Sequence, residues 1–300
     1  MTKFIVVTDT HIANPVQTTP CLWWNNLLLH LVGSELADAW IAEVNDRKPD
    51  FLLHCGDLMH RVTRAAAKDV RTMMDRLDCP YYMTLGNHDF TNKEDVSEND
   101  LLSILGIPGN TPDYACNQSG FRITAFAFDA TYTEDEIEQK INWLENELQN
   151  ETELPLIFLT HAPLSLDMRE RSGSVPGEKP GCGSISEHLK VYLWPQRERI
   201  LELLQKRGNV VGIFTGHTHT SDVTYPGGLL HCVTPAMSAY PCAIRECQIQ
   251  NDEITVKSIH FDKFAEQSLV KERGNQWVKG TPETQEFVHN FKTIMGNEQK

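Results

Sequence analysis

Five short polar loops in this sequence carry side chains that commonly bind metal ions, and each loop follows an apolar run of strand length. The fullest is Gly86-Asn87-His88-Asp89, which offers an amide oxygen, an imidazole and a carboxylate directly after the run 81–85. Alone, this tetrapeptide is ordinary turn chemistry, because Gly and Asn are common turn residues. However, four other loops of the same type follow apolar runs. They hold Asp9 with His11, Asp57, His161, and His217 with His219.

The apolar runs before these loops decide whether the polar side chains can meet. The first third of the chain alternates such runs with helical patterns over 22–44, where Gly33-Ser34 is the expected point of a break, and over 65–77. This β-α-β-α-β order predicts parallel strands joined by right-handed crossovers. Because loops at the carboxyl ends of neighbouring strands share one edge of a sheet, we expect the five loops to converge there.

The donor types in these loops indicate a particular kind of metal site. Carboxylate, amide and imidazole donors without a thiolate suit Mn, Fe, Zn or Co. Seven donors are more than one catalytic ion with an open position needs, so the set predicts two ions that share a carboxylate. Such pairs stabilise the attacking and leaving oxygens of a phosphoryl displacement. The candidate ligands are Asp9, His11, Asp57, Asn87, His161, His217 and His219.

The five blocks, taken in order, match a known pattern. Asp-x-His, Gly-Asp, Gly-Asn-His-Asp, Thr-His and Gly-His-x-His resemble the calcineurin-like metallophosphoesterase superfamily, and most of all its class III cyclic-nucleotide phosphodiesterase group, over about residues 3–260. The resemblance implies an α/β (α+β) fold, a four-layer α-β-β-α sandwich of two mixed sheets flanked by helices. It also implies two ligand sets that share Asp57. One is Asp9, His11, Asp57 and His219, and the other is Asp57, Asn87, His161 and His217.

The resemblance further implies a reaction and roles for the residues around the metals. A metal-bridging hydroxide would attack phosphorus in line, while His88 would protonate the leaving oxygen or stabilise its charge. Asp57 would bridge the ions, and Asp89 would fix its loop. The cofactors implied are two divalent ions, or iron with a divalent ion, with Mn or Fe favoured over Zn or Co.

The chain departs from the family pattern where substrate would bind. Leu58-Met59-His60-Arg61 follows the Gly-Asp block, and the long Pro- and Gly-rich stretch within 162–194 predicts a lid or pocket wall. We expect the metallophosphoesterase domain to span 1–265. The segment 266–300 would be an extension whose helix, over 282–295, packs on the domain or forms a homodimer interface. The predicted substrate contacts are Asn87, His88, Arg61, Arg169, Arg171, Tyr192 and Trp194.

Composition limits the partners and the compartment. The chain has 300 residues, of which 40% are hydrophobic and 23% charged, and a formal charge of −14. This charge argues against nucleic acid or an anionic membrane as partner. No apolar run approaches the length of a membrane span, and no secretory signal precedes the first strand. Eight cysteines without a Cys-x-x-Cys pair favour reduced thiols in the cytoplasm.

These observations favour a phosphodiesterase that acts on a small nucleotide, such as a 3′,5′-cyclic nucleotide. A phosphomonoesterase acting on a small metabolite or a phosphoprotein is the first alternative. A non-catalytic scaffold of the same fold is the second, although scaffolds are expected to lose ligands and this chain keeps the full set. A nuclease is disfavoured by the negative charge.

Overall fold

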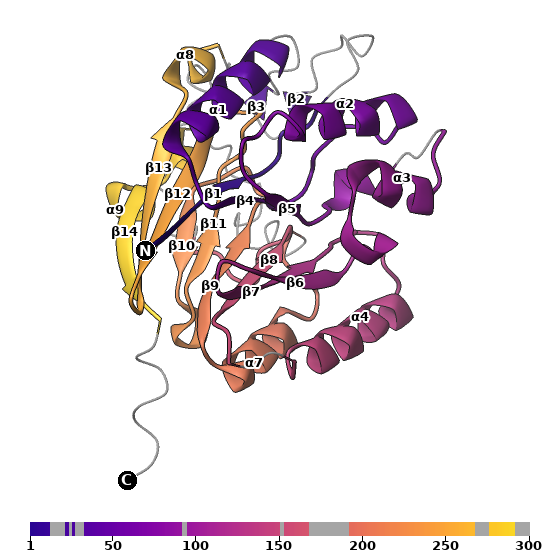
Figure 1. The fold of residues 1–300 in the computed structure, drawn as a ribbon, viewed down its shortest axis with the longest axis vertical. Coiled ribbons are helices and arrows are strands. Elements are labelled where there is room, and N and C mark those ends of the chain that lie inside the picture. The colour runs from indigo at the N-terminus through magenta and orange to yellow at the C-terminus, as the bar shows by residue number, and fades with distance from the viewer. Residues whose placement is uncertain are drawn as a thin grey trace, which may run out of the picture.

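Two six-stranded mixed β-sheets pack face to face in the computed structural model of the chain (Figure 1). The structure describes residues 1–12, 22–23, 26–27, 33–91, 95–150, 153–167, 192–267 and 276–291. The first sheet has the order β14 (Glu286–Asn290), β13 (Glu253–His260), β12 (Ala243–Gln250), β1 (Thr2–Val7), β4 (Phe51–His54) and β5 (Tyr81–Met83). The second has the order β10 (Asp222–Thr224), β11 (His231–Val233), β9 (Val210–Thr215), β8 (Leu156–Thr160), β7 (Phe121–Phe126) and β6 (Tyr114–Gln118).

Helices cover the outer faces of both sheets. On the side of the first sheet lie α1 (Gly33–Arg47), α2 (Arg64–Met74) and α3 (Glu98–Leu105), and on the side of the second lie α4 (Glu134–Glu147) and α7 (Arg197–Arg207) (Figure 1). The predicted four-layer sandwich is therefore confirmed. The shorter elements are β2 (Leu22–Trp23), β3 (Asn26–Leu27), η2 (Asn87–Asp89), η3 (Pro108–Asn110), η4 (Pro226–Gly228), α8 (Asp262–Ala265), η6 (Gln276–Lys279) and α9 (Pro282–Gln285).

Strand β8 shows how one element serves two cores. Ile157 and Leu159 are buried in the cluster between the sheets, whereas Leu156 and Phe158 are buried in the cluster beneath α4 and α7. Successive side chains of a strand point to opposite faces, so a strand covered on both sides is apolar throughout. This explains why the runs before the ligand loops are continuous and not alternating.

The parallel arrangement predicted for the first third is confirmed. β1 pairs in parallel with β4, and β4 pairs in parallel with β5. The register places Val7 opposite His54 and His54 opposite Met83, so the three strands end together. Their following loops therefore leave the same edge of the first sheet, and the loops after β8 and β9 approach it from the second.

The predicted helix over 22–44 is wrong in its first part. Residues 22–23 and 26–27 form a short antiparallel pair, and α1 begins at Gly33. Gly33 is the first residue of α1, so the helix begins at the point where a break was expected.

The predicted helix over 282–295 is also wrong over 286–290, and its residues 292–295 lie outside the described part of the chain. α9 ends at Gln285, and residues 286–290 continue as β14, which pairs antiparallel with β13. The alternation of Phe287, His289 and Phe291 places these side chains on the inner face, and Phe291 is buried. Pairing with the open edge of β13 outweighs the helical pattern.

The short strands after His219 are divided between the two sheets. β12 and β13 form an antiparallel hairpin in the first sheet, and its turn lies at Asn251-Asp252. β11, in contrast, pairs in parallel with β9 and antiparallel with β10, and so belongs to the second sheet. Strand type is readable from the sequence here, whereas the pairing partner is not.

The described part of the C-terminal segment is tied to the rest of the domain. The Arg245 guanidinium is fully buried and donates to the Thr284 carbonyl, the Ser221 hydroxyl and the Val233 carbonyl. Buried hydrogen bonds and the pairing of β14 with β13 therefore hold residues 276–291 against the two sheets.

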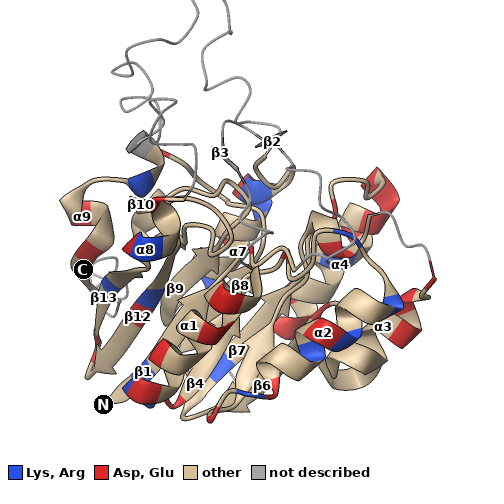
Figure 2. Cartoon of the chain, turned by 90° about the horizontal axis from the view of Figure 1, so that it is seen from above, with Lys and Arg blue, Asp and Glu red and all other residues tan. Residues whose placement is uncertain are grey.

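The described cysteines are free thiols, and charged side chains lie on the surface of the described helices. Six described cysteines are free, and four of them are buried: Cys55, Cys232, Cys242 and Cys247. Among the described residues, no helix has the length and apolarity required to cross a membrane. Acidic and basic residues are interspersed along α2, which carries Arg64, Lys68, Asp69 and Arg71 (Figure 2).

Candidate metal centre

The predicted ligands stand in strained loops at the strand ends. Non-glycine residues rarely adopt positive φ, yet Asp9, His11, Asp57, His217 and His219 do so, with φ of 52°, 43°, 53°, 68° and 53°. Each such residue costs about 1–3 kcal/mol, and clusters of them mark functional sites. The surrounding backbone holds them there. The N–H of Asp9 donates to the Gly56 carbonyl, and the N–H of His11 donates to the Asp57 carbonyl.

The first group of ligands consists of Asp9, His11 and His219. The Oδ1 atom of Asp9 lies 3.2 Å from Nε2 of His219 and 3.7 Å from Nε2 of His11. The two imidazole Nε2 atoms are 3.2 Å apart. The other carboxylate oxygen of Asp9 accepts from the Thr8 hydroxyl and from the N–H of His217. These bonds orient the carboxylate, so Oδ1 faces the two histidines.

The second group consists of Asp57, His161 and His217. Nε2 of His161 lies 3.1 Å from Oδ2 of Asp57 and 3.1 Å from Nδ1 of His217. Nδ1 of His161 donates to the Cys55 carbonyl at 2.8 Å, which fixes the tautomer and leaves Nε2 to act as a ligand. Asn87 enters from η2 of the neighbouring loop, and its Oδ1 is buried.

Asp57 stands between the two groups. Its Oδ2 lies 3.6 Å from Nε2 of His11 and 3.1 Å from Nε2 of His161, whereas its Oδ1 accepts from the N–H of His88 at 2.9 Å. One carboxylate oxygen thus faces both histidine groups. This is the arrangement expected of a bridging ligand.

Burial and charge act against each other in this site. Burial opposes ionisation of Asp9 and Asp57, but the nearby imidazoles hold the pKa of both carboxyls well below its ordinary value. Burial lowers the pKa of His11 to about 4 and that of His217 to about 3. Burial alone would also lower the pKa of His161, but the adjacent Asp57 carboxylate raises it to about 9. Both carboxylates are therefore charged, and two of the imidazoles are neutral and available as ligands.

The seven residues fit a pair of metal ions. Oδ1 of Asp9 and Oδ1 of Asn87 are buried, and neither has a hydrogen-bond partner within the described ranges. Such buried acceptors are costly unless they bind a cation or water. The oxygen and nitrogen donors suit Mn, Fe, Zn or Co. Asp9, His11, Asp57 and His219 would hold one ion, and Asp57, Asn87, His161 and His217 the other.

Two glycines permit the loops to approach this closely. A Cβ atom on Gly86 would collide with the Asp57 carboxylate, and one on Gly216 would collide with the Thr8 hydroxyl and the Asp9 carboxylate. Both glycines precede ligand-bearing residues. The glycine that begins each of the blocks Gly-Asn-His-Asp and Gly-His-x-His is therefore required, because there is no room for a Cβ atom at either position.

Asp89 connects two of the loops. It is fully buried, and its carboxylate accepts from the N–H groups of Leu58, Met59 and Gly86. These bonds hold the loop after β4 against the loop after β5. This geometry supports the predicted loop-fixing role and places no reactive atom of Asp89 in the site.

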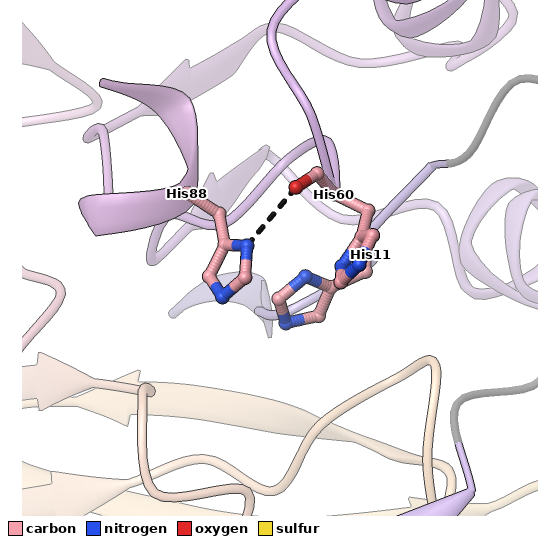
Figure 3. Close-up of side chains that lie close together, drawn as sticks. All are labelled: His11, His60 and His88. Carbon is pink, nitrogen blue, oxygen red and sulfur yellow. Dashed lines mark hydrogen bonds between the residues drawn. The ribbon is translucent and has the colours of Figure 1, made fainter. Parts of the chain in front are cut away.

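His88 lies at the edge of the centre, in a cluster with two other histidines. Its Nδ1 donates to the His60 carbonyl at 3.0 Å, its ring stacks on the His60 ring, and its edge meets His11, with ring centroids 5.1 Å and 4.7 Å apart (Figure 3). Nitrogen atoms of the three rings lie within 4.8 Å of one another. His88 therefore stands beside the first ligand group, where a proton donor would be needed.

The predicted substrate contacts outside the Gly-Asn-His-Asp block fall into four cases. Tyr192 is partly exposed, with its ring centroid 5.3 Å from that of His217, so it lies at the site. Arg61 is exposed on the loop that carries His60. Trp194 is fully buried, its indole N–H donates to Thr160, and its ring packs on Phe126 and Phe128. A substrate role for Trp194 is not supported. Arg169 and Arg171 lie outside the described residues.

Two residues near the site that are not among the predicted ligands, His54 and Thr10, form hydrogen bonds between the loops. The N–H of Gly56 donates to Nδ1 of His54, so the neutral ring carries its proton on Nε2, which lies 3.1 Å from Oγ1 of Thr10. The Thr10 hydroxyl in turn donates to the Leu58 carbonyl. The chain of bonds ties the Asp9 loop to the Asp57 loop. The feature of the sequence that could have identified His54 is its position three residues before Asp57.

Comparison with known proteins agrees with this geometry. A family model described as calcineurin-like phosphoesterase matches residues 2–221. The chain belongs to this family. It is accordingly a metal-dependent phosphoric ester hydrolase with the metallophosphoesterase fold. The family depends on two metal ions, and the groups Asp9-His11-His219 and Asp57-His161-His217 are candidates to hold them.

Two curated relatives and one solved structure extend the comparison. The chain is 23% identical over 266 residues to a Synechococcus protein named a probable cyclic nucleotide phosphodiesterase, covering 85% of this chain and 90% of that one. It is 24% identical over 236 residues to an Arcobacter nitrofigilis protein named a probable glycerophosphodiester phosphodiesterase, covering 73% and 72%. A dimetal phosphatase from Danio rerio superposes with a TM-score of 0.63 at 15% identity, over 86% of this chain and 96% of that one. This last likeness shows the shared fold.

Proposed function

We propose that this calcineurin-like phosphoesterase is a phosphodiesterase that acts on a small nucleotide, such as a 3′,5′-cyclic nucleotide. The observation that carries the proposal is the pair of ligand groups that share Oδ2 of Asp57, with His88 beside them. Two bound cations would supply Lewis-acid stabilisation of the charge that develops on the phosphoryl oxygens. We favour Mn or Fe as the native ions, with Zn or Co as alternatives.

The chain's own residues provide positioning and a proton. Because Nδ1 of His88 donates to the His60 carbonyl, Nε2 is the nitrogen that can deliver a proton to the leaving oxygen. The N–H of His88 also donates to Oδ1 of Asp57, so one short loop sets both the bridging carboxylate and the acid. Asn87 would hold the substrate phosphate as well as a metal.

Three observations support a small diester as substrate. Both curated relatives are named as phosphodiesterases, one for cyclic nucleotides and one for a glycerol-based diester. The ring of Tyr192 beside His217 is a surface on which a base could stack. The formal charge of −14 counts against a polynucleotide, because such ligands need a basic face. Free, buried cysteines support a cytoplasmic location.

The deciding experiment compares three substrates on one preparation. The Mn-loaded protein is assayed with 3′,5′-cyclic AMP, bis-p-nitrophenyl phosphate and p-nitrophenyl phosphate, and bound metal is measured in parallel. We expect turnover of both diesters and little turnover of the monoester. A monoester preference would replace the proposal with a phosphomonoesterase. Absence of turnover with two ions bound would favour a scaffold.

A further inference from the structure

We propose that His60 is a positioning residue for His88 and that its imidazole ring determines how well the enzyme handles poor leaving groups. The inference rests on the proposed function, because it assigns His60 a part in the same reaction. His60 is not among the seven candidate ligands, and it follows Asp57 by three residues in the loop after β4. Its ring and its backbone carbonyl both contact His88.

The backbone of His60 is held in place from one side by the first ligand loop. The N–H of His60 donates to the Ile12 carbonyl at 3.0 Å, and the N–H of Ile12 donates to the Leu58 carbonyl at 2.9 Å. Ile12 also forms a parallel bridge with Met59. The His60 carbonyl is therefore a fixed acceptor, and it sets which nitrogen of His88 carries the internal hydrogen bond.

The ring of His60 adds a constraint that the carbonyl cannot provide. A single hydrogen bond at Nδ1 leaves the His88 ring able to rock about that bond. The His60 ring lies against one face of His88, with centroids 5.1 Å apart and planes inclined by 25°, and His11 meets His88 edge-on at 87° (Figure 3). The ring contacts and the carbonyl together define the direction in which Nε2 of His88 points.

This arrangement has a consequence that depends on the leaving group. Protonation by a positioned acid matters most when the leaving oxygen is basic, and it matters little for a nitrophenolate. Misplacement of a catalytic group by about 1 Å can cost on the order of a hundredfold in rate. Loss of the His60 ring should therefore slow the hydrolysis of esters with poor leaving groups selectively, because the acid His88 remains present but its Nε2 is less well positioned.

Side-chain substitution separates the ring from the carbonyl, since every variant keeps the backbone acceptor. His60→Ala removes the ring, His60→Phe keeps a flat ring without nitrogen, and His60→Gln keeps a hydrogen-bonding group without a ring. The matched control is His289→Ala, on β14 at the far edge of the first sheet. The substrates are methyl phenyl phosphate and methyl 4-nitrophenyl phosphate, which differ only in the leaving group. Bound Mn and thermal midpoint are measured for each protein.

We expect His60→Ala to lower kcat on methyl phenyl phosphate by about ten- to a hundredfold and kcat on methyl 4-nitrophenyl phosphate by less than about threefold. His60→Phe should restore most of the loss, with metal content and thermal midpoint unchanged. Equal losses on both substrates, or no loss, would overturn the inference. Rescue by Gln but not by Phe would also overturn it, because the imidazole would then contact the substrate directly.

The same measurement distinguishes the two proposals. If the wild-type protein hydrolyses only monoesters, the proposed function fails, and the ratio on phenyl phosphate and 4-nitrophenyl phosphate still tests His60. If it hydrolyses diesters, but substitution of His60 does not change the ratio of kcat on methyl phenyl phosphate to kcat on methyl 4-nitrophenyl phosphate, only the inference fails. If it hydrolyses no ester with metal bound, both are wrong.

Discussion

Oδ2 of Asp57 lies 3.1 Å from Nε2 of His161, and the same oxygen lies 3.6 Å from Nε2 of His11. His161 follows β8 in the second sheet, and His11 follows β1 in the first. The carboxylate thus joins ligands that the two sheets deliver separately. Its other oxygen is occupied by the N–H of His88. A substitution at this one residue should therefore weaken metal binding at both ligand groups.

Replacement of Asp57 by Asn tests this bridging role. The amide keeps the shape of the side chain but removes the negative charge, and neutral ligands hold divalent cations less well. We expect bound metal to fall from two ions towards none, and kcat to fall by at least about a thousandfold, because the charge stabilisation is lost. Metal analysis and turnover of bis-p-nitrophenyl phosphate provide the measurement.

Asp38→Asn is the matched control, because this carboxylate lies on α1, 65% exposed and paired only with an exposed arginine in the described contacts. It should retain both ions and full activity. Retention of one tightly bound ion in Asp57→Asn would contradict a bridging role and assign Asp57 to a single metal.

The hydroxyl of Thr10 provides a second test, this time of the hydrogen bonds that hold the loops together. Burial lowers the pKa of His54 to about 3, so the ring is neutral and its Nε2–H donates to Thr10. Thr10→Val preserves the shape but leaves the N–H of His54 and the Leu58 carbonyl without this partner. We expect the free energy of unfolding to fall by about 1–3 kcal/mol in urea.

Thr10→Ser is the control for this prediction, because it keeps the hydroxyl and removes only a methyl group. It should lose less stability than Thr10→Val and bind metal as the wild-type protein does. If the two variants are equally destabilised, the methyl group is the important part of Thr10 and the hydrogen bonds are not.

The site was more predictable from the sequence than several elements of the fold, for a physical reason. Each ligand follows directly after its own apolar strand, so a local pattern records both the donor and its place at the sheet edge. Strand β14 is different, because residues 286–290 become a strand only through pairing with β13. Nor does the sequence distinguish Tyr192, which lies at the site, from the buried Trp194, because burial depends on packing across the whole core.

Tyr192 provides a test of the nucleotide preference. Its ring lies 5.3 Å from that of His217, and stacking of a base on an aromatic side chain contributes about 1–3 kcal/mol. Tyr192→Ala should raise KM for 3′,5′-cyclic AMP by about tenfold and leave kcat nearly unchanged. Tyr192→Phe should behave as the wild-type protein. Glycerol-3-phosphoethanolamine, a diester without an aromatic ring, is the control substrate, and an equal rise in its KM would contradict base stacking.

His231 provides a pH-dependent test that is independent of the metal ligands. It is fully buried on β11, Nε2 accepts from the N–H of Leu164, and Nδ1 lies 3.3 Å from the Thr224 hydroxyl. Burial lowers its pKa to about 3 in the folded state, whereas an unfolded histidine titrates near about 6.5. Below about pH 6.5 His231 therefore binds a proton in the unfolded chain but not in the folded chain. The stability that His231 contributes is complete above about pH 6.5 and is lost progressively down to about pH 3, at about 1.4 kcal/mol per pH unit.

His231→Gln keeps an acceptor for the N–H of Leu164 but cannot titrate. Between pH 7.5 and 5.5 the wild-type protein should lose about 1.4 kcal/mol more of its free energy of unfolding than the variant does. Urea unfolding of the metal-free proteins at both values measures this difference, and the shared contribution of the other histidines cancels. The outcome that would contradict the argument is a variant as acid-sensitive as the wild-type protein, since that would mean that His231 accepts a proton without unfolding. His289→Gln, at a half-buried position on β14, should reduce the acid sensitivity by less than His231→Gln does, because burial lowers its pKa to a smaller extent.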